Sequence, residues 1–288
     1  MVSTHLDRDH IAGLTPILEN LTVEQLIMHR PWLHSVSMDG NVQKEAPEAR
    51  KSYQQASDLE QLAISKNIPI TEPFAGGGLT FTDTAYMYIL GPDQSYYEQL
   101  LQDFDHNKSI LTKLAEMVKA PATTAAEVIR KIQETLDPST STLDHVHKNT
   151  SPENSSSAIL YFDIEGHEML FTGDAGIEAL NKAINFAIAS QLDLTRLNFL
   201  DVPHHGSKHN LDTSVLNRIK AQTAFISATK DIKKHPSPRV INELVRRGYK
   251  VFTTESSNIL HHFNAPQRSN YSSMTPHSLI PEFDEDDD

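Results

Sequence analysis

The second half of the chain alternates apolar strands with helices, and this pattern most constrains the fold. The stretch "SAILYFDIEGHEMLFTGDAG" predicts two strands joined by a tight turn at Glu165 and Gly166. Further apolar strands are expected in "LNFLDV", "TAFISATK" and "YKVFTTE", with a helix in "SPRVINELVRRG" that Gly248 would close. Strands that alternate with helices indicate an α/β domain.

The first half predicts helices around a short hairpin. Apolar residues at helical spacing in "IAGLTPILENLTVEQLIM" and in "SYQQASDLEQLAISKN" predict two helices. "GGGLTFTDTAYMYILGP" alternates and is rich in aromatic and β-branched residues, so we expect a hairpin whose turn contains the glycines 76–78. Charged helical periodicity and then polar turn residues, from about 92 to 148, predict a helical insertion.

Composition limits the chemistry that is open to the chain. Its 288 residues include no cysteine, so disulfides and thiolate ligands are excluded and a metal would be held by His, Asp or Glu. The net charge of −13 argues against general adhesion to nucleic acid, for which a local basic groove would be needed. We expect residues 266–288, which end in "EFDEDDD", to form a solvated acidic tail.

The sequence also bears on location and domain number. No apolar stretch approaches the roughly 20 residues that cross a bilayer, and the first residues lack the pattern of a signal peptide. We therefore expect a cytoplasmic protein without a membrane segment. A chain of this length can bury a core, and we expect one domain over residues 1–265, interrupted by the insertion.

A cluster of possible metal ligands stands near the start of the chain. His5, Asp7, Asp9 and His10 lie within six residues, which a tight loop can fold around two adjacent cations. A charged loop before a helix is the alternative, since Asp and His are ordinary residues at a helix start.

Two later motifs match that cluster. "FTGDA" places Asp174 at the end of a strand, where one carboxylate can bridge two metals. "PHHGSK" places two imidazoles, a hydroxyl and an ammonium group at the end of the next strand, from His204, His205, Ser207 and Lys208. Ligands at the carboxyl ends of strands are how α/β scaffolds build sites.

The order of "THLDRDHIAGL", "ENSSSAILYF", "LFTGDAG", "VPHHGSKHN" and "HPSPRVINELVRRGYKVF" resembles the metallo-β-lactamase fold hydrolases. Within them it most resembles the soluble, nuclease-like domain of the ComEC competence proteins and their stand-alone relatives. The resemblance implies a metallo-β-lactamase-like αββα sandwich. Several strands precede the metal loop in that family and none precedes His5 here, so we expect the fold to be N-terminally incomplete. An upstream segment or a partner would then complete the sheet.

The resemblance also implies a site with two divalent metal ions. It pairs His5 with Asp7 at one metal and Asp9 with His10 at the other, and makes Asp174 the bridge. One of His204 and His205 would be the last ligand, and the sequence does not choose between them. Asp7 stands where many members have His, and "SPENSSS" replaces a further His, so Mn²⁺ is as suitable as Zn²⁺. We assign catalytic roles to Asp9, His205 and Lys208, and substrate binding to Ser207, Lys208 and His235.

The expected activity is that of a metal-dependent phosphodiesterase or nuclease, in which a metal-bound hydroxide attacks a DNA or nucleotide phosphate. The acidic surface instead favours a small-ester hydrolase acting on a phosphocholine ester or a lactone. A truncated, non-catalytic module is the third hypothesis. His235 is also interpretable as an ordinary residue before a helix. We expect the four histidines His145, His147, His261 and His262 to be solvated.

Overall fold

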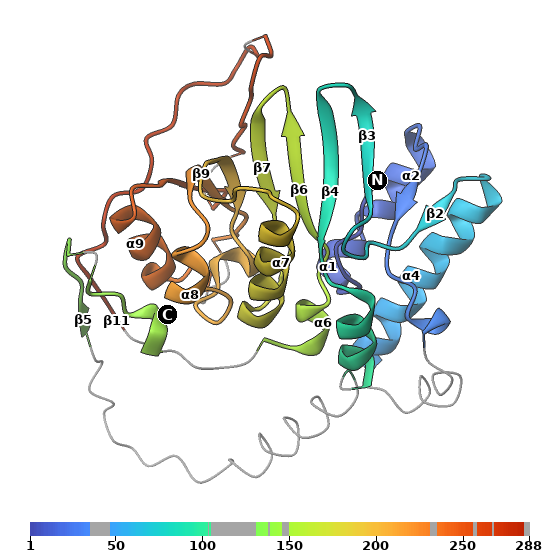
Figure 1. The fold of residues 1–288 in the computed structure, drawn as a ribbon, viewed down its shortest axis with the longest axis horizontal. Helices are drawn as coiled ribbons and strands as arrows, with labels where there is room; N and C mark the ends of the chain where they lie inside the picture. The colour runs from blue at the N-terminus through green and yellow to red at the C-terminus, as the bar shows by residue number, and fades with distance from the viewer. Residues whose placement is uncertain are drawn as a thin grey trace.

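The computed structural model describes residues 1–34, 47–102, 104, 131–137, 139–145, 150–230, 235–255, 258–266 and 268–284. Within these ranges the chain is a mixed α/β protein around a seven-stranded sheet (Figure 1). The strand order is β10 (Lys250–Thr253), β9 (Ala221–Ile226), β8 (Leu197–Asp201), β7 (His167–Phe171), β6 (Ile159–Ile164), β4 (Ala85–Gly91) and β3 (Gly78–Thr82). Strands β7 to β10 run parallel, whereas β3, β4, β6 and β7 pair antiparallel.

The predicted hairpin is confirmed. Strands β6 and β7 pair up to Ile164 and His167, so Glu165 and Gly166 form the two-residue turn between them. Both turn residues have positive φ, 55° and 79°, as a type I′ turn requires. The strands expected further along are β8, β9 and β10. The expected helix is α9 (Pro238–Arg246), which is followed by Gly248 with φ 83°.

One face of the large sheet is covered by α7 (Ile177–Ala189), α8 (Thr213–Leu216) and α9. Apolar side chains from these helices and from alternate strand positions form the largest buried cluster; among them are Leu180, Ile184, Val215, Ala224, Ile226, Val240, Leu244 and Val251. The alternation along a strand therefore leaves Thr223 and Phe225 of β9, and Lys250 and Phe252 of β10, on the other face of the sheet.

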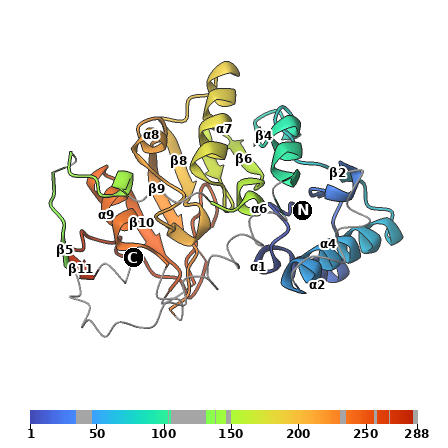
Figure 2. The same cartoon turned by 90° about the horizontal axis from the view of Figure 1, so that it is seen from below.

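A second, small sheet packs on that other face. Strand β1 (Leu26–Ile27) pairs in parallel with β2 (Ile70–Thr71), and Val2 forms a parallel bridge with Ile27. Ile27 packs with Met87 and Ile89 of β4. Leu26 points the opposite way, into a cluster under α1 (Arg8–Ile11), α2 (Leu14–Asn20) and α4 (Pro47–Ser65). The layers are therefore helices, small sheet, large sheet and helices, with α4 and α7 on opposite sides (Figure 2).

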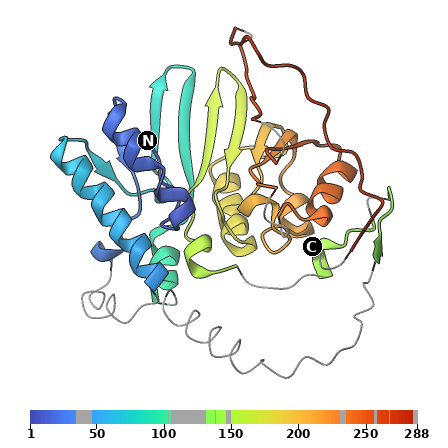
Figure 3. The ribbon, with the colours of Figure 1, turned by 180° about the vertical axis from the view of Figure 1, so that it is seen from behind.

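The helix expected over residues 11–28 is shorter than predicted. It is divided into α1 and α2, which pack beside α4 at one end of the large sheet (Figure 3), and it ends at Asn20. Leu26 and Ile27 form a strand because their side chains are buried on opposite sides of the small sheet. The glycines 76–78 also lie elsewhere than predicted: the hairpin turn follows Thr82, and Gly78 begins β3, where an added Cβ would lie 2.3 Å from the carbonyl oxygen of Met87.

The predicted helical insertion is only partly helical. Residues 94–102 form a helix, but Lys131–Gln133, which we expected to be helical, form strand β5. Strand β5 pairs antiparallel with β11 (Glu282–Asp284), so a contact between distant segments replaces the local helical preference. Residues 105–130 and 146–149 lie outside the described ranges, as does the side chain of His145.

The expectation of a solvated tail is wrong for its described later part. The backbone N–H of His277 donates to Val251, and the N–H of Ile280 donates to the Asn242 side chain, at 2.8 and 2.7 Å. Phe283 in β11 is only 7% exposed, and the Arg239 guanidinium lies 5.9 Å from its ring centre. Backbone hydrogen bonds, the pairing of β11 with β5 and a buried aromatic ring therefore fix the described part of this segment to the domain. Residues 285–288 lie outside the described part.

Two further expectations concern the membrane and the solvated histidines. Among the helices of the described ranges, none combines the length and the apolar character needed to span a bilayer.

His262 is exposed as expected. His261 is not: it is half-buried, and its Nε2 lies 2.9 Å from Nε2 of His167. His147 lies outside the described part.

A buried histidine near the small sheet makes the fold sensitive to acid. His29 is 1% exposed and stacks on Tyr97, with ring centres 4.2 Å apart. Neither of its ring nitrogens has a hydrogen-bond partner of good geometry among the described residues. Burial therefore lowers the pKa of His29 to about 3. Below its ordinary pKa of about 6.5 the unfolded chain takes up a proton that the folded chain excludes, so stability is lost as the pH falls.

We expect His29→Phe to reduce this acid sensitivity. Each pH unit below about 6.5 costs the wild type up to about 1.4 kcal/mol at this residue, and Phe removes that contribution while it keeps the stacking. The measurement is the free energy of urea unfolding at about pH 7 and about pH 5, with His262→Phe as the exposed control. A His29→Phe protein that loses as much stability as the wild type would contradict this account.

Candidate metal centre

The three motifs singled out in the sequence meet at the carboxyl ends of β7 and β8. Asp174 follows β7, and the 3₁₀ helix η4 (His204–Gly206) follows β8. The first loop is brought to the same place because the backbone N–H of Ala158, just before β6, donates to the carbonyl oxygen of Thr4 at 2.8 Å. Ile11 is buried below the loop and anchors its other end.

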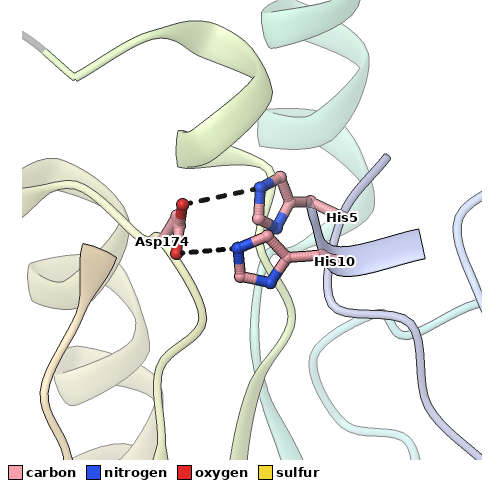
Figure 4. A group of neighbouring side chains, drawn as sticks. All are labelled: His5, His10 and Asp174. Carbon is pink, nitrogen blue, oxygen red and sulfur yellow. Dashed lines mark ion pairs between the residues drawn. The ribbon is translucent and has the colours of Figure 1, made fainter. Parts of the chain in front are cut away.

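His5, His10 and Asp174 form the inner part of the site. Figure 4 shows the two imidazoles facing the carboxylate from one side. The Nε2 atom of His5 lies 3.8 Å from Oδ2 of Asp174, and that of His10 lies 3.3 Å from Oδ1. Both Nε2 atoms are buried, and neither has a hydrogen-bond partner of good geometry within the described ranges. Ligand atoms around a cation with bonds of 2.0–2.1 Å lie about 3.3 Å apart, so this spacing suits an ion between them.

A second group shares His10 with the first. It consists of Asp9, His10 and His205, whose ligand atoms lie within 4.8 Å of one another. Oδ2 of Asp9 lies 3.5 Å from Nε2 of His205 and 3.7 Å from Nε2 of His10. Both groups use the same Nε2 atom of His10, which can bind one cation, so His10 can complete only one of two neighbouring positions.

The structure brings both His204 and His205 to the centre. His204 directs Nε2 toward Oδ2 of Asp174 at 3.8 Å, on the oxygen that also faces His5. His205 instead directs Nε2 toward Asp9. The choice that the sequence left open is therefore not between a residue inside the site and one outside it. His205 belongs to the second group, with Asp9 and His10. His204 lies beside the first group, with its Nε2 near Oδ2 of Asp174.

The orientation of each ring is fixed through Nδ1. His204 donates from Nδ1 to Oδ1 of Asn210 at 3.0 Å. Asn210 is itself fixed, because its Nδ2 donates to the carbonyl oxygens of Asp174 and Ala175 at 2.9 and 3.1 Å. His205 donates from Nδ1 to the carbonyl oxygen of Ser227 at 2.6 Å. Both rings therefore present Nε2 to the carboxylates, as a metal-binding histidine does when its other nitrogen is hydrogen-bonded.

The backbone of η4 is strained in the way that functional sites often are. His204 and His205 have φ of 48° and 55°, and Gly206 has φ of 77°. A left-handed conformation costs a residue with a Cβ roughly 1–2 kcal/mol. Glycine is required at 206 in addition, because an added Cβ would lie 3.0 Å from side-chain carbons of Ile226 and Pro236. The sharp turn brings two consecutive imidazoles to the site, with their ring centres 6.0 Å apart.

Ser157 links the first loop to Asp174. Its Oγ accepts from the backbone N–H of Asp174 at 3.0 Å and lies 3.2 Å from Nδ1 of His5. Thr4 Oγ1 lies 3.1 Å from the same nitrogen. Because these two hydroxyl oxygens lie next to Nδ1 of His5, the ring directs its other nitrogen, Nε2, toward Asp174. Ser157 is not among the predicted site residues, since nothing in "NSSS" distinguishes a fully buried serine from an exposed one.

The protonation states of His5, Asp174 and Asp9 suit cation binding, whereas contacts with Asp174 and Asp9 outweigh burial and raise the pKa of His10. Burial, and then the neighbouring His10, lower the pKa of His5 to about 3, so this imidazole is neutral. Burial alone would raise the pKa of Asp174, but the contacts with His10 and His5 outweigh it and the pKa is lowered. The hydrogen bond from His205 lowers the pKa of Asp9 well below its usual range.

His205 has the opposite shift. Its contact with Asp9 raises the pKa of His205 to about 9, so the imidazole carries a proton at neutral pH when no cation is bound. A cation on Nε2 would displace that proton, and metal binding at such a site releases protons to solution.

The other predicted site residues lie at the edge of this centre. Asp7 is 38% exposed, and its Oδ2 lies 4.0 Å from Nε2 of His5. The ring of His235 lies 5.3 Å from that of His204, and burial lowers its pKa to about 4. Ser207 is buried, and its Oγ accepts from the backbone N–H of His209 at 3.2 Å. Lys208 follows it and is half-buried.

Asn154 is another residue of the site that the sequence motifs did not predict. It lies in the short helix α6 (Pro152–Ser155), which Ser151 caps by accepting from the Asn154 backbone N–H. Its Nδ2 lies 3.5 Å from Nε2 of His204. Its Oδ1 is buried without a hydrogen-bond partner among the described residues. This oxygen is therefore a further possible metal ligand next to the imidazoles.

Comparison with known proteins gives a distant similarity. No model of a known protein family matches the chain. A stretch of 118 residues is 29% identical to part of ComE operon protein 3 of Bacillus subtilis (strain 168), a competence-related protein. The match covers 39% of this chain and 15% of the length of that relative. The chain is therefore loosely similar to a small part of a competence-related protein.

Proposed function

We propose that this chain is a metal-dependent phosphodiesterase with a metallo-β-lactamase-like fold over residues 1–265. The observation that carries the proposal is the convergence of His5, His10 and Asp174, where two buried imidazole nitrogens without partners of good geometry face two different carboxylate oxygens. Nitrogen and oxygen donors of this kind suit Zn²⁺ or Mn²⁺.

Two further observations agree with the proposal. The small sheet lies between α4 and the large sheet, and α7 covers the far face, which is the layer order of an αββα sandwich. The similarity to ComE operon protein 3 is in keeping with a ComEC-like relationship. The expectation that a partner or an upstream segment completes the small sheet, and the cytoplasmic location, stay predictions.

The residues around the centre have distinct proposed roles. Divalent cations held by these ligands would activate water near neutral pH and neutralise charge on a phosphate. Asp9 would orient the attacking water, since its side chain is the most exposed of the five residues in the two groups. The protonated His205 would form an ion pair with that carboxylate in the free protein. Ser207, Lys208 and His235 would bind phosphate oxygens at the side of His204.

A small-ester hydrolase is the alternative, and one observation favours it. The chain carries a net charge of −13, which repels a polyanion and leaves a small neutral or zwitterionic ester unaffected. The same centre could polarise the carbonyl oxygen of a lactone or activate a phosphocholine ester.

The test is turnover by the metal-free chain after Mn²⁺ or Zn²⁺ is restored. We expect hydrolysis of bis(p-nitrophenyl) phosphate with either metal, Mn²⁺ supporting at least as much activity as Zn²⁺, and none in excess chelator. Turnover of p-nitrophenyl acetate alone would favour the ester hydrolase. Metal bound well below one ion per chain together with no turnover would favour the non-catalytic module, and full activity in chelator would overturn a metal mechanism.

A further inference from the structure

A cavity of about 310 Å³ lies on the large sheet, on the face opposite α7, α8 and α9. Its floor is formed by two strands, with Thr223 and Phe225 from β9 and Lys250 and Phe252 from β10. Its outer wall consists of residues 258–262, Arg268 and residues 271–274, among them Tyr271. The volume is at the lower end of the range for small-ligand sites, so it can hold one ring with its substituents.

The cavity is lined with aromatic rings. Phe225 and Phe252 lie 5.7 Å apart between ring centres and continue a row across the sheet, in which Phe199 lies 5.1 Å from Phe225. The rings of Phe225 and Phe252 are half-buried, and Tyr271 is 43% exposed at the open side. Rings that keep an accessible face offer stacking surfaces for planar groups, and base stacking on such rings tolerates any sequence.

The same cavity is basic in an acidic protein. Lys250, Arg268 and the exposed His262 line it, and no acidic side chain is among the described residues of its wall. Neither Lys250 nor Arg268 forms an ion pair with another described residue. Against a net charge of −13, two cationic groups without an acidic neighbour in the wall are a local site for an anion.

Strand β9 connects this cavity with the metal centre. Ser227, whose carbonyl oxygen holds His205, directly follows β9 and lies two residues after Phe225. Lys250 is the register partner of Thr223, four residues before Ser227, which is about 13 Å along a strand. A ligand that reaches from the centre to Lys250 must therefore be an extended chain rather than a single small ester.

We propose that the cavity binds one nucleotide of a single-stranded nucleic acid. The base stacks on the rings of Phe225, Phe252 or Tyr271, and the phosphate pairs with Lys250 and Arg268. That the bound nucleic acid runs from this cavity toward the metal centre rests on the proposed phosphodiesterase function. The binding of a nucleotide in the cavity does not depend on that function.

Binding is tested with the metal-free wild-type chain, which cannot turn over the probe by the proposed mechanism, and a short fluorescein-labelled oligothymidylate, by fluorescence anisotropy at fixed salt. We expect the double variant Lys250→Gln, Arg268→Gln to bind about tenfold or more weakly, and Tyr271→Ala about fivefold or more weakly. Lys182→Gln on α7, which removes one charge from the opposite side of the sheet, should bind like the wild type.

Further measurements distinguish a failure of base stacking, a failure of the binding site and a failure of the proposed function. An abasic strand of the same length should bind markedly more weakly, and equal binding would overturn base stacking in favour of a simple anion site. Wild-type affinity of the double variant would overturn the site altogether. Hydrolysis of bis(p-nitrophenyl) phosphate, which is too short to reach Lys250, should be unchanged in the double variant. If the wild type binds the oligonucleotide as expected but hydrolyses no phosphodiester, the proposed function fails while the binding site stands.

Discussion

On the proposed metal mechanism, replacement of Asp174 by asparagine is expected to abolish cation binding and to lower phosphodiester turnover on the order of a thousandfold or more. The amide keeps the size of the side chain but removes the negative charge that His5, His10 and His204 face at 3.3–3.8 Å. Two cations would then approach one another with no anion between them. Asp174 is also buried, so water cannot take the place of its carboxylate at low cost.

The measurement is metal content by elemental analysis together with turnover at saturating metal. Asp83→Asn provides the matched control, because Asp83 is exposed in the turn between β3 and β4 and the change in charge is the same. Cation content and turnover close to those of the wild type in Asp174→Asn would mean that the centre has been misplaced.

Replacement of Gly173 by alanine is expected to lower turnover about a hundredfold, although the glycine carries no ligand atom. Gly173 has φ of 51°, and an added Cβ would lie 3.1 Å from Cβ atoms of both Ser157 and Thr4. These two residues hold Nδ1 of His5, and Ser157 also holds the backbone of Asp174. A shift of about 1 Å in a catalytic group is enough for a loss of this size.

Gly166→Ala separates this displacement from backbone strain. Gly166 also has positive φ, 79°, but an added Cβ there meets no atom within 4 Å. Both variants should lose about 1 kcal/mol of stability in thermal unfolding, because alanine is unfavourable at positive φ. Only Gly173→Ala should also lose metal affinity, measured by titration of the metal-free chain. Equal metal affinity in the two variants would show that Ser157 and Thr4 do not position the ligands.

Local chemistry made part of the fold predictable. The turn at Glu165 and Gly166 could be located because two residues with positive φ suffice to join β6 and β7. The strands β8, β9 and β10 could be located because each is a short apolar run bounded by turn residues. The pair β5 and β11 could not, since three-residue strands in charged segments carry no local pattern and depend on each other for stability.

The candidate site divides in the same way. Clusters of His and Asp are visible in a sequence, so His5, His10 and Asp174 could be proposed before their distances were known. The residues that orient them could not. Asn210 and Ser157 act through single hydrogen bonds to ring nitrogens and backbone groups, and these bonds exist only after distant segments have met. Whether these orienting contacts serve catalysis stays a prediction.

The pairing of β5 with β11 has a consequence for the order in which the chain assembles. Lys131 faces Asp284 in this pair, whereas Leu160 faces Phe171 in the β6–β7 hairpin of the large sheet. Loop-closure entropy makes contacts of large sequence separation slow to form, and synthesis delivers β11 long after β5. The centre of the large sheet can therefore form while β5 is still unpaired. Strand β11, which lies near α9, is then among the last elements to pair.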